Sequence, residues 1–485
     1  MKVLFVYPNI AQSHSPQVGL SSLAGTLIEN GHDCRLFDLT FLDLAEAPDK
    51  FREAIGEYLP DLIGISCRST EWQATRGLLS LIENKIPVVI GGPHPTIAPE
   101  EVIAEERVDM LVRGEGEEAL LDLVERMEAG RPLRDMPNLW VKEDGKVYRN
   151  ELRPLIQDLD SLAMPEWSIW DGRHFRDSYH QAFSPGAEIF GDLETSRGCP
   201  YSCPYCLNPA MQKIYKGKGR YHREKSAARV IKEIEKMRDE LRIDYIRFVD
   251  ETFILNKKRI KEFCRLYENI RLPFYFMTRP ETVNDEIFAD LAAVGANCVS
   301  FGLESGNEQY RREMLNRKTT QQQVINAMKI SKKHGLKTFA FAMIGLPQET
   351  RAGIQDTMEL INIVQPDVFE VSIFYPFEGT PFYHYCIDHG LMKADHEQLA
   401  EIVSGSVLNQ PGLSSDYLVR LRALMLAFAK RDRRLWPLMR FLEKRPLAFK
   451  IWKVGRRFWG RGMKELRRGS RRKKSSVPKQ PEMAA

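Results

Sequence analysis

The stretch Glu194-Thr-Ser-Arg-Gly-Cys199-Pro-Tyr-Ser-Cys203-Pro-Tyr-Cys206 places three cysteines at a C-x3-C-x2-C spacing. A short strand-like run, 187–193, precedes it. Gly198, Pro200 and Pro204 interrupt the loop, so that neither a strand nor a helix can continue through it. A loop that wraps in this way lets three thiolates converge, and soft thiolates at this density suit an iron–sulfur cluster or zinc.

The loop supplies three ligands and no fourth. A ferredoxin-type cluster or a structural zinc site needs a fourth ligand nearby. The next cysteine is Cys264, and the nearest histidine is His222. Three cysteines alone favour a cluster that binds a ligand at its free iron. The alternatives are a partial zinc knuckle and three buried thiols.

The loop, with Tyr205 before its last cysteine, resembles that of the radical S-adenosylmethionine (SAM) superfamily. The resemblance implies that Cys199, Cys203 and Cys206 hold a [4Fe–4S] cluster. It also implies that the open iron is chelated by the amino and carboxylate groups of SAM. We therefore expect a radical generator at this loop.

Composition suggests an ordinary globular chain. It has 485 residues, of which 43% are hydrophobic and 28% charged, and this length suggests about three domains. Outside the loop the eight cysteines are isolated, which argues against a disulfide framework and favours a reducing, cytoplasmic compartment. The sequence predicts neither a signal peptide nor a membrane span.

Residues 1–130 alternate between strand and helix patterns, which predicts a doubly wound, Rossmann-like parallel sheet. The expected strands are 3–7, 34–38, 62–66, 88–90 and 110–112, and the expected helices are 19–30, 70–84 and 115–128. Ligands of such sheets bind at the carboxyl ends of the strands. The residues at those ends are Tyr7, Pro8, Ser66, Gly91, Gly92, Pro93, His94, Gly114, Glu115, Gly116 and Glu117.

Each of these motifs taken singly is typical of the turns of any flavodoxin-like sheet. Together, and ahead of the cysteine loop, Gly91-Gly-Pro-His-Pro-Thr and Arg113-Gly-Glu-Gly-Glu resemble the cobalamin-binding domain of cobalamin-dependent radical SAM enzymes. The resemblance makes the strand-end residues candidates for cobalamin binding. His14 does not fit the Asp-x-His-x-x-Gly motif that ligates cobalt in many cobalamin domains. His94 is a possible ligand, but we expect it to pack near the corrin through its backbone.

Residues 131–186 read as a linker that contains a hairpin at 139–149, with its turn at Asp144-Gly145. Residues 187–390 then give six strand–helix units, which predict a partial (β/α)6 barrel of the TIM type with its site at the carboxyl ends of the strands. The expected strands are 187–193, 244–250, 273–278, 297–303, 337–344 and 368–374. The expected helices are 224–240, 256–270, 284–294, 319–334 and 351–364.

The same resemblance implies the SAM site. Its candidates are Tyr205, Asp250, Glu251, Arg279, Glu304, Ser305, Gly306 and Arg317. We expect Asp250 and Glu251 to touch the SAM ammonium group, and Glu304 to bind the ribose or the amine. For Arg317, a SAM carboxylate contact and a helix cap are equally open. Acidic residues at strand ends also serve as ordinary helix N-caps.

Residues 391–474 are predicted to be helical, with helices at 396–404 and 415–430, and 475–485 to be a disordered tail. Residues 430–474 carry 19 Lys and Arg against 3 Asp and Glu, interspersed with aromatic and aliphatic residues. This pattern favours a membrane surface as partner. Single-stranded nucleic acid and a merely solvated helix are the alternatives.

These features predict a cobalamin-dependent radical SAM enzyme. As the resemblance implies, it would cleave SAM reductively to a 5′-deoxyadenosyl radical and methylate an unactivated carbon of a small-molecule or lipid-like substrate. It would need an electron donor of the flavodoxin or ferredoxin type. A radical cyclase of the anaerobic porphyrin type is the alternative, and a non-catalytic cobalamin sensor with a structural zinc is the third. No single catalytic side chain is assigned. We expect a cytoplasmic protein, peripheral to the inner face of the membrane.

Overall fold

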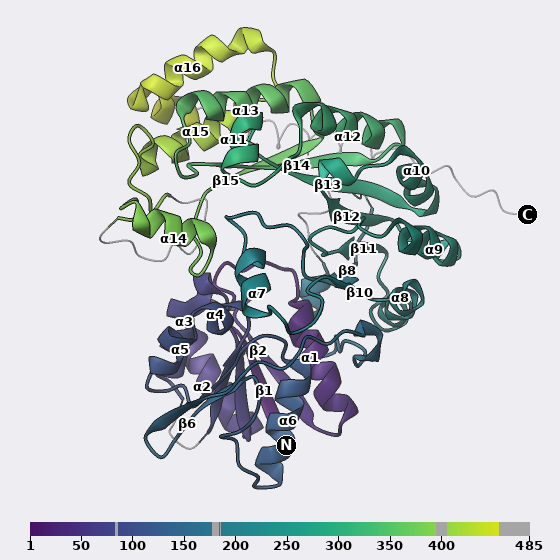
Figure 1. The fold of residues 1–485 in the computed structure, drawn as a ribbon, viewed down its shortest axis with the longest axis vertical. Coiled ribbons are helices and arrows are strands. Elements are labelled where there is room, and N and C mark those ends of the chain that lie inside the picture. Colours follow the sequence, from purple (N-terminus) through teal and green to yellow (C-terminus); the bar gives the residue numbers. More distant parts are fainter. Residues whose placement is uncertain (83–85, 177–183, 185, 394–404, 455–485) are drawn as a thin grey trace, which may run out of the picture.

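The computed structural model contains two large, mainly parallel sheets, one above the other in Figure 1, with the C-terminal helices against the upper one. It describes residues 1–82, 86–176, 184, 186–393 and 405–454. Both sheets are covered by helices, as parallel sheets require. The predicted α/β class is confirmed.

The first sheet has seven strands in the order β2-β1-β3-β4-β5-β6-β7. Its strands are β1 (Lys2–Tyr7), β2 (Asp33–Asp38), β3 (Leu62–Ser66), β4 (Val88–Gly91), β5 (Met110–Val112), β6 (Leu139–Glu143) and β7 (Lys146–Arg149). The first five are parallel, as predicted. The hairpin β6–β7 was assigned to the linker, but β6 pairs antiparallel with β5. Its buried residues Leu139–Val141 complete the core at this edge, so the sheet extends to Arg149.

Residues of β1 alternate between two cores, because successive strand side chains point to opposite faces. Phe5 packs with α1 and α6, and Val6 packs on the opposite face with α2, α3 and α5. The helices are α1 (Val18–Glu29), α2 (Ala47–Tyr58), α3 (Trp72–Leu79), α4 (Pro93–Ile97), α5 (Pro99–Ala104) and α6 (Glu117–Glu128). Helices α2, α4 and α5 were not predicted from the sequence.

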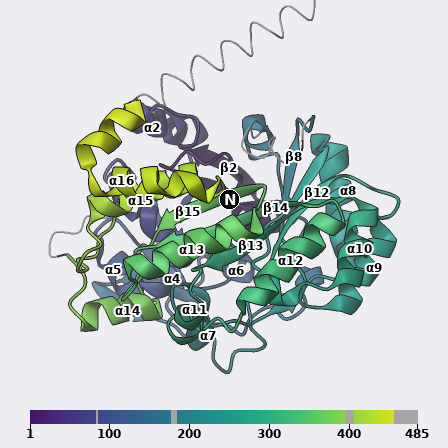
Figure 2. The same cartoon turned by 90° about the horizontal axis from the view of Figure 1, so that it is seen from above.

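The second sheet has six parallel strands in the order β15-β14-β13-β12-β11-β8. They are β8 (Phe190–Leu193), β11 (Tyr245–Phe248), β12 (Phe274–Thr278), β13 (Ala296–Glu304), β14 (Lys337–Ile344) and β15 (Val368–Ile373). Strands β8 and β15 are the two edges, so the barrel is open, and its helices form an outer layer (Figure 2). The predicted partial barrel is confirmed.

The outer helices of this barrel are α8 (Ala227–Leu241), α9 (Lys257–Tyr267), α10 (Asp285–Val294), α12 (Gln321–Lys333) and α13 (Arg351–Val364). Each follows a Ser, Asn or Thr whose side chain accepts a backbone N–H of the first turn, as good N-caps do. Shorter elements not predicted are α7 (Asn208–Ile214), α11 (Glu308–Glu313), α14 (Pro381–Asp388) and the ladder of β9 (Ser196–Arg197) with β10 (Arg223–Glu224). Single 3-10 turns lie at Ser69–Glu71, Leu159–Ser161, Gly172–Phe175, Pro280–Thr282 and Arg433–Leu435.

At the C-terminal end, α15 (Ser415–Phe428) contacts β15, and α16 (Trp436–Lys444) packs on α15. A further helical run covers 446–454. The predicted helix at 396–404, the residues 455–474 and the predicted tail lie outside the described residues. Among the described helices, none combines the length and the apolar character needed to cross a bilayer.

Candidate active site between the two sheets

The cysteine loop follows β8 and is held by the β9–β10 ladder, in which Arg197 pairs with Arg223. Gly198 has a φ of +76°, and a Cβ there would lie 2.4 Å from the carbonyl oxygen of Tyr221. Only glycine fits this close approach without strain. The loop therefore turns back at the carboxyl end of the strand, where the sequence predicted a site.

Two of the three cysteine sulfurs accept hydrogen bonds. The Asn208 amide donates to Cys206 Sγ at 3.4 Å, and the Arg279 guanidinium donates to Cys203 Sγ at the same distance. Cys199 and Cys203 are buried, and Cys206 is partly exposed. Burial raises the pKa of the Cys199 and Cys206 thiols. Donors to sulfur are one of the means by which proteins tune iron–sulfur clusters.

The geometry of the loop does not suit a single zinc ion. Among the described residues, the three sulfurs do not form a group whose atoms all lie within 4.8 Å of one another, whereas sulfurs bound to one zinc at about 2.3 Å must lie closer than that. The nearest histidine, His222, is not grouped with the cysteines in this way: its Nδ1 donates to the Gly198 carbonyl at 2.8 Å, and its Nε2 lies 3.7 Å from Glu224. The loop fits a larger cluster.

Arg317 joins the cysteine loop to the end of β13. Its buried guanidinium donates to the Gly302 carbonyl at 2.7 Å, to the Tyr205 hydroxyl at 3.0 Å and to Glu304 Oε1 at 3.3 Å. Glu304 has a φ of +62°, an unfavourable left-handed conformation that clusters at functional sites. Helix α12 is capped by Thr320, so Arg317 does not act as a helix cap.

Arg279 lies over the Tyr201 ring, with its guanidinium carbon 3.7 Å from the ring centroid. It also donates to Glu281 at 2.5 Å and to Cys203. Glu251 also lies near the cysteines, since its charge acts on both Cys199 and Cys206. Burial raises the pKa of Glu251.

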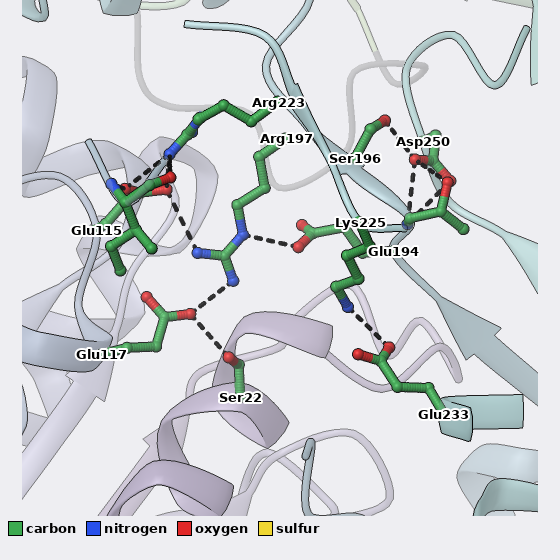
Figure 3. A network of polar contacts seen from close by, with 12 residues as sticks. Ser22, Glu115, Glu117, Glu194, Ser196, Arg197, Arg223, Lys225, Glu233 and Asp250 are labelled. Carbon is green, nitrogen blue, oxygen red and sulfur yellow. Dashed lines mark hydrogen bonds and ion pairs between the residues drawn. The ribbon is translucent and has the colours of Figure 1, made fainter. Parts of the chain in front are cut away.

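Two expectations for the SAM site do not match the structure. The buried carboxylate of Asp250 accepts a hydrogen bond from the Ser196 hydroxyl (Figure 3). It also accepts bonds from the N–H and the hydroxyl of Thr195. Because those bonds engage it within the protein, Asp250 is not available to an ammonium group. Gly306 packs against α13, where a Cβ would lie 2.2 Å from the Asp356 carbonyl oxygen, and Ser305 is fully buried beside it. These two residues fix the chain rather than line a pocket.

A cavity of about 330 Å³ lies at the carboxyl ends of the first sheet's strands, within the usual size range of ligand pockets. Its wall contains Ser66, Gly91, Gly92, Pro93, Gly114, Glu115, Gly116 and Glu117. The opposite wall comes from the second domain and includes Arg197, Gly198, Met211, Tyr215, Tyr221 and Arg223. The cavity therefore lies between the first sheet and the cysteine loop.

Tyr7, Pro8 and His94 do not belong to the wall of this cavity. Arg68 donates to the Tyr7 hydroxyl at 3.2 Å, and the His94 ring packs on Trp72 with a centroid distance of 5.2 Å. These contacts hold both side chains elsewhere. Of the described residues that line the cavity, none is a histidine.

Four charged residues tie the two domains together beside the cavity (Figure 3). We call Glu115, Glu117, Arg197 and Arg223 the interdomain latch. Arg197 contacts Glu117 at 2.6 Å and Glu115 at 3.4 Å, and Arg223 contacts Glu115 at 2.8 Å. Arg197 also pairs with Glu194 at 2.8 Å.

The latch carboxylates were predicted to bind cobalamin; they line the cavity and also pair with Arg197 and Arg223. Burial raises the pKa of Glu117, but the Arg197 charge and hydrogen bonds from Arg197 and Ser22 outweigh it and lower that pKa to about 2. Neither arginine was predicted to be a site residue. Arg197 lies two residues before the first cysteine, and this position could have marked it as a site residue.

Comparison with known proteins agrees with the motifs. Residues 193–361 match the model of the radical SAM superfamily, and residues 10–124 match that of the B12-binding domain. The chain is 32% identical over 410 residues to an uncharacterised methyltransferase of Pyrococcus horikoshii, which covers 81% of this chain and 84% of that protein. It is 27% identical over 396 residues to the anaerobic magnesium-protoporphyrin IX monomethyl ester cyclase of Rubrivivax gelatinosus, covering 78% and 68%.

Among solved structures, the fold is similar to the radical SAM methyltransferase TsrM of Kitasatospora setae with cobalamin and a [4Fe–4S] cluster bound. The TM-score is 0.67 at 19% identity, over 90% of this chain and 85% of that one. Three findings agree: the cysteine loop, the B12-binding domain that precedes it, and the identity of 32% to a relative along most of that relative's length. The chain belongs to the cobalamin-dependent radical SAM enzymes.

Proposed function

We propose that the protein is a cobalamin-dependent radical SAM C-methyltransferase that methylates an unactivated carbon of a small molecule. One observation carries the proposal: Gly198 of the cysteine loop and Gly91 at the end of β4 line the same cavity. Two cofactor sites that face each other suit a reaction in which one cofactor activates the substrate and the other supplies the group to be transferred.

The residues present fit these cofactors. Cys199, Cys203 and Cys206 would hold the cluster, and Glu251, Arg279 and Glu304 lie where they could orient SAM. When bound, the cluster and SAM supply a radical that removes a hydrogen atom, and cobalamin supplies the capacity to carry a methyl group. The chain's own part is to position these groups and to exclude water.

The cavity also fits a ligand that approaches the backbone closely. A Cβ on Gly91 would meet no atom within 4 Å, so this glycine leaves open space on the cavity side of β4. Residues of both domains line the cavity, so a ligand as large as cobalamin would contact both.

The first test is methyl transfer. Anaerobically reconstituted protein, reduced through a flavodoxin- or ferredoxin-type donor, is incubated with methyl-labelled SAM and extracts of cells that lack the gene. We expect a labelled product and 5′-deoxyadenosine from wild type. Cys203→Ala should form neither, while Cys264→Ala, a buried cysteine outside the loop, should form both.

The alternative is a radical cyclase or oxidase without methyl transfer, which the similarity to the porphyrin cyclase favours. The same assay separates the two. Formation of 5′-deoxyadenosine with an oxidised, unlabelled product would support the cyclase and exclude the methyltransferase.

We further propose that the C-terminal helices rest on an anionic membrane surface at the inner face of the cytoplasmic membrane, which favours a lipid-like substrate. The large apolar residues exposed here are Leu435, Leu438, Phe441, Leu447, Ile451 and Val454. Basic residues lie between them in the sequence. Each Lys or Arg near an anionic leaflet contributes about 1 kcal/mol.

Vesicle sedimentation tests this contact. Wild type should sediment with phosphatidylglycerol vesicles and not with neutral ones, and Leu447→Glu with Ile451→Glu should abolish sedimentation. Ile363→Glu, exposed on α13, is the matched control and should sediment normally. If a single-stranded oligonucleotide binds in place of the vesicles, the membrane assignment is wrong.

A further inference from the structure

Three side chains outside the cavity converge across the domain boundary. His94 lies in α4 and Glu101 in α5, both in the first domain, and Glu378 lies in the turn between β15 and α14 of the second. One ligand atom from each lies within 4.8 Å of the other two. Beside Glu378, a Cβ on Gly379 would lie 3.2 Å from Ile97 Cβ, so this turn packs closely against α4.

The His94 ring is held so that one nitrogen faces the carboxylates. The side chain is fully buried against Trp72, and Nδ1 lies 3.2 Å from the Ser69 hydroxyl. Nε2 is buried and has no hydrogen-bond partner. An unsatisfied buried polar atom costs about 1–3 kcal/mol, and native structures contain few of them.

The distance between His94 Nε2 and Glu101 Oε2 indicates what kind of partner the unpaired His94 nitrogen could take. It is 3.6 Å, which is too long for a hydrogen bond. Two ligands at about 2.1 Å from one tetrahedral ion are separated by about 3.4 Å. The pair is therefore spaced like two ligands of a shared cation.

We propose that His94, Glu101 and Glu378 form a binding site for a divalent transition-metal ion that clips the first domain to the end of the barrel. One imidazole and two carboxylates suit Zn²⁺, Mn²⁺ or Fe²⁺ rather than a soft, thiolate-bound ion. The Glu101 side chain is 43% exposed, which gives the ion a path from solvent. The Ser69 contact fixes the ring orientation, as hydrogen bonds to metal-bound histidines usually do.

The electrostatics agree with the geometry. Burial lowers the pKa of His94, which keeps the imidazole in the neutral form that binds metals. Burial and the Glu101 charge raise the pKa of Glu378 to about 7, because two carboxylates at this distance repel each other. A cation removes that repulsion. A proton shared by the two carboxyl groups is the competing explanation.

Metal titration of the holoprotein separates the two explanations. Mn²⁺ is added to reconstituted protein with its cluster and cobalamin in their oxidised, diamagnetic states, and free Mn²⁺ is followed by electron paramagnetic resonance. Zn²⁺ is measured separately by competition with a chromophoric chelator. We expect one site of at least micromolar affinity for one of these ions, and a rise in melting temperature when it is filled.

Glu378→Gln keeps the size of the side chain and should weaken binding at least tenfold, and His94→Gln should do the same. Glu100→Gln, on the same helix but paired with Arg149, is the control and should bind like wild type. Binding of neither ion, or equal affinity in wild type and Glu378→Gln, would overturn the proposal and leave the shared proton as the explanation.

Discussion

The pairing of Glu117 with Arg197 in the interdomain latch gives a measurable prediction. We would replace Glu117 by Gln and Arg197 by Met, singly and together, in reconstituted protein. Gln can still accept the Ser22 hydroxyl, which now donates to Glu117 at 2.7 Å. The double-mutant cycle therefore isolates the ionic part of the pair from its packing.

The structure sets the size of the effect. The pKa of Glu117 falls from 4.5 to about 2, and each pKa unit corresponds to about 1.4 kcal/mol. The ionised form is thus favoured in the folded state by about 3 kcal/mol. Removal of Arg197 should cost about 3–5 kcal/mol, because it leaves a buried carboxylate without its partner. We expect a coupling energy of about 2–3 kcal/mol between the two positions.

The assay is urea unfolding followed by tryptophan fluorescence. Trp170 donates to the Ser21 hydroxyl at 2.8 Å, next to Ser22 in α1, and so reports on this boundary. Because a depressed pKa stabilises the fold above pH 4.5, the Glu117 contribution should be complete at pH 7 and decline as the pH falls below 4.5. Glu117→Gln should remove that pH dependence.

The control is the exposed pair of Arg52 with Asp49, where Asp49→Asn should change stability by no more than about 0.5 kcal/mol. A coupling energy at Glu117 and Arg197 no larger than that of the exposed pair would refute the reasoning. It would mean that the two domains are held by apolar contacts and that the latch charges are solvated.

Three further predictions follow from single contacts. Gly91→Ala should lower cobalamin affinity at least tenfold in a binding titration while leaving the melting temperature unchanged, because its Cβ would enter open space on the cavity side; a normal affinity would contradict the placement. Gly114→Ala should lower the free energy of unfolding, measured in urea, by more than about 2 kcal/mol. The φ of Gly114 is +81°, and a Cβ there would lie 1.7 Å from the Tyr215 hydroxyl oxygen. Burial raises the pKa of Glu349 to about 8, so stability should fall between pH 4.5 and 8 by up to about 5 kcal/mol. Glu349→Gln should abolish that fall, and parallel pH profiles would show that the carboxyl group is solvated.

Much of the fold was predictable because apolar periodicity is a local property. The six barrel strands end where alternating apolar runs meet polar or glycine residues, and all six were found within a few residues of their predicted bounds. Helix α2 was missed because Ala47-Pro48-Asp49 reads as a turn, although Pro in the first turn of a helix is favourable. The hairpin β6–β7 was recognised, but its partner β5 could not be known from local pattern alone.

Site residues were predictable where the ligand chemistry fixes their spacing in the sequence. They were less predictable where their role depends on contacts between the two domains. The three cysteines follow from their spacing. Asp250 and Glu251 are neighbouring carboxylates at one strand end, so the sequence could not tell them apart. Only the tertiary structure shows that Thr195 and Ser196 donate hydrogen bonds to the Asp250 carboxylate. Glu115 and Glu117 were assigned to a ligand because their arginine partners lie about 80 to 108 positions later in the chain.

The closure of the first sheet by β7 at Arg149 has a consequence for synthesis. All seven strands of this sheet precede the cysteine loop, so the domain can fold on the ribosome while the second domain is still being made. At that stage one wall of the cavity is absent and Glu117 has no arginine partner. A nascent chain would then present the strand-end half of the cavity, with both latch carboxylates unpaired, before the cysteine loop is made.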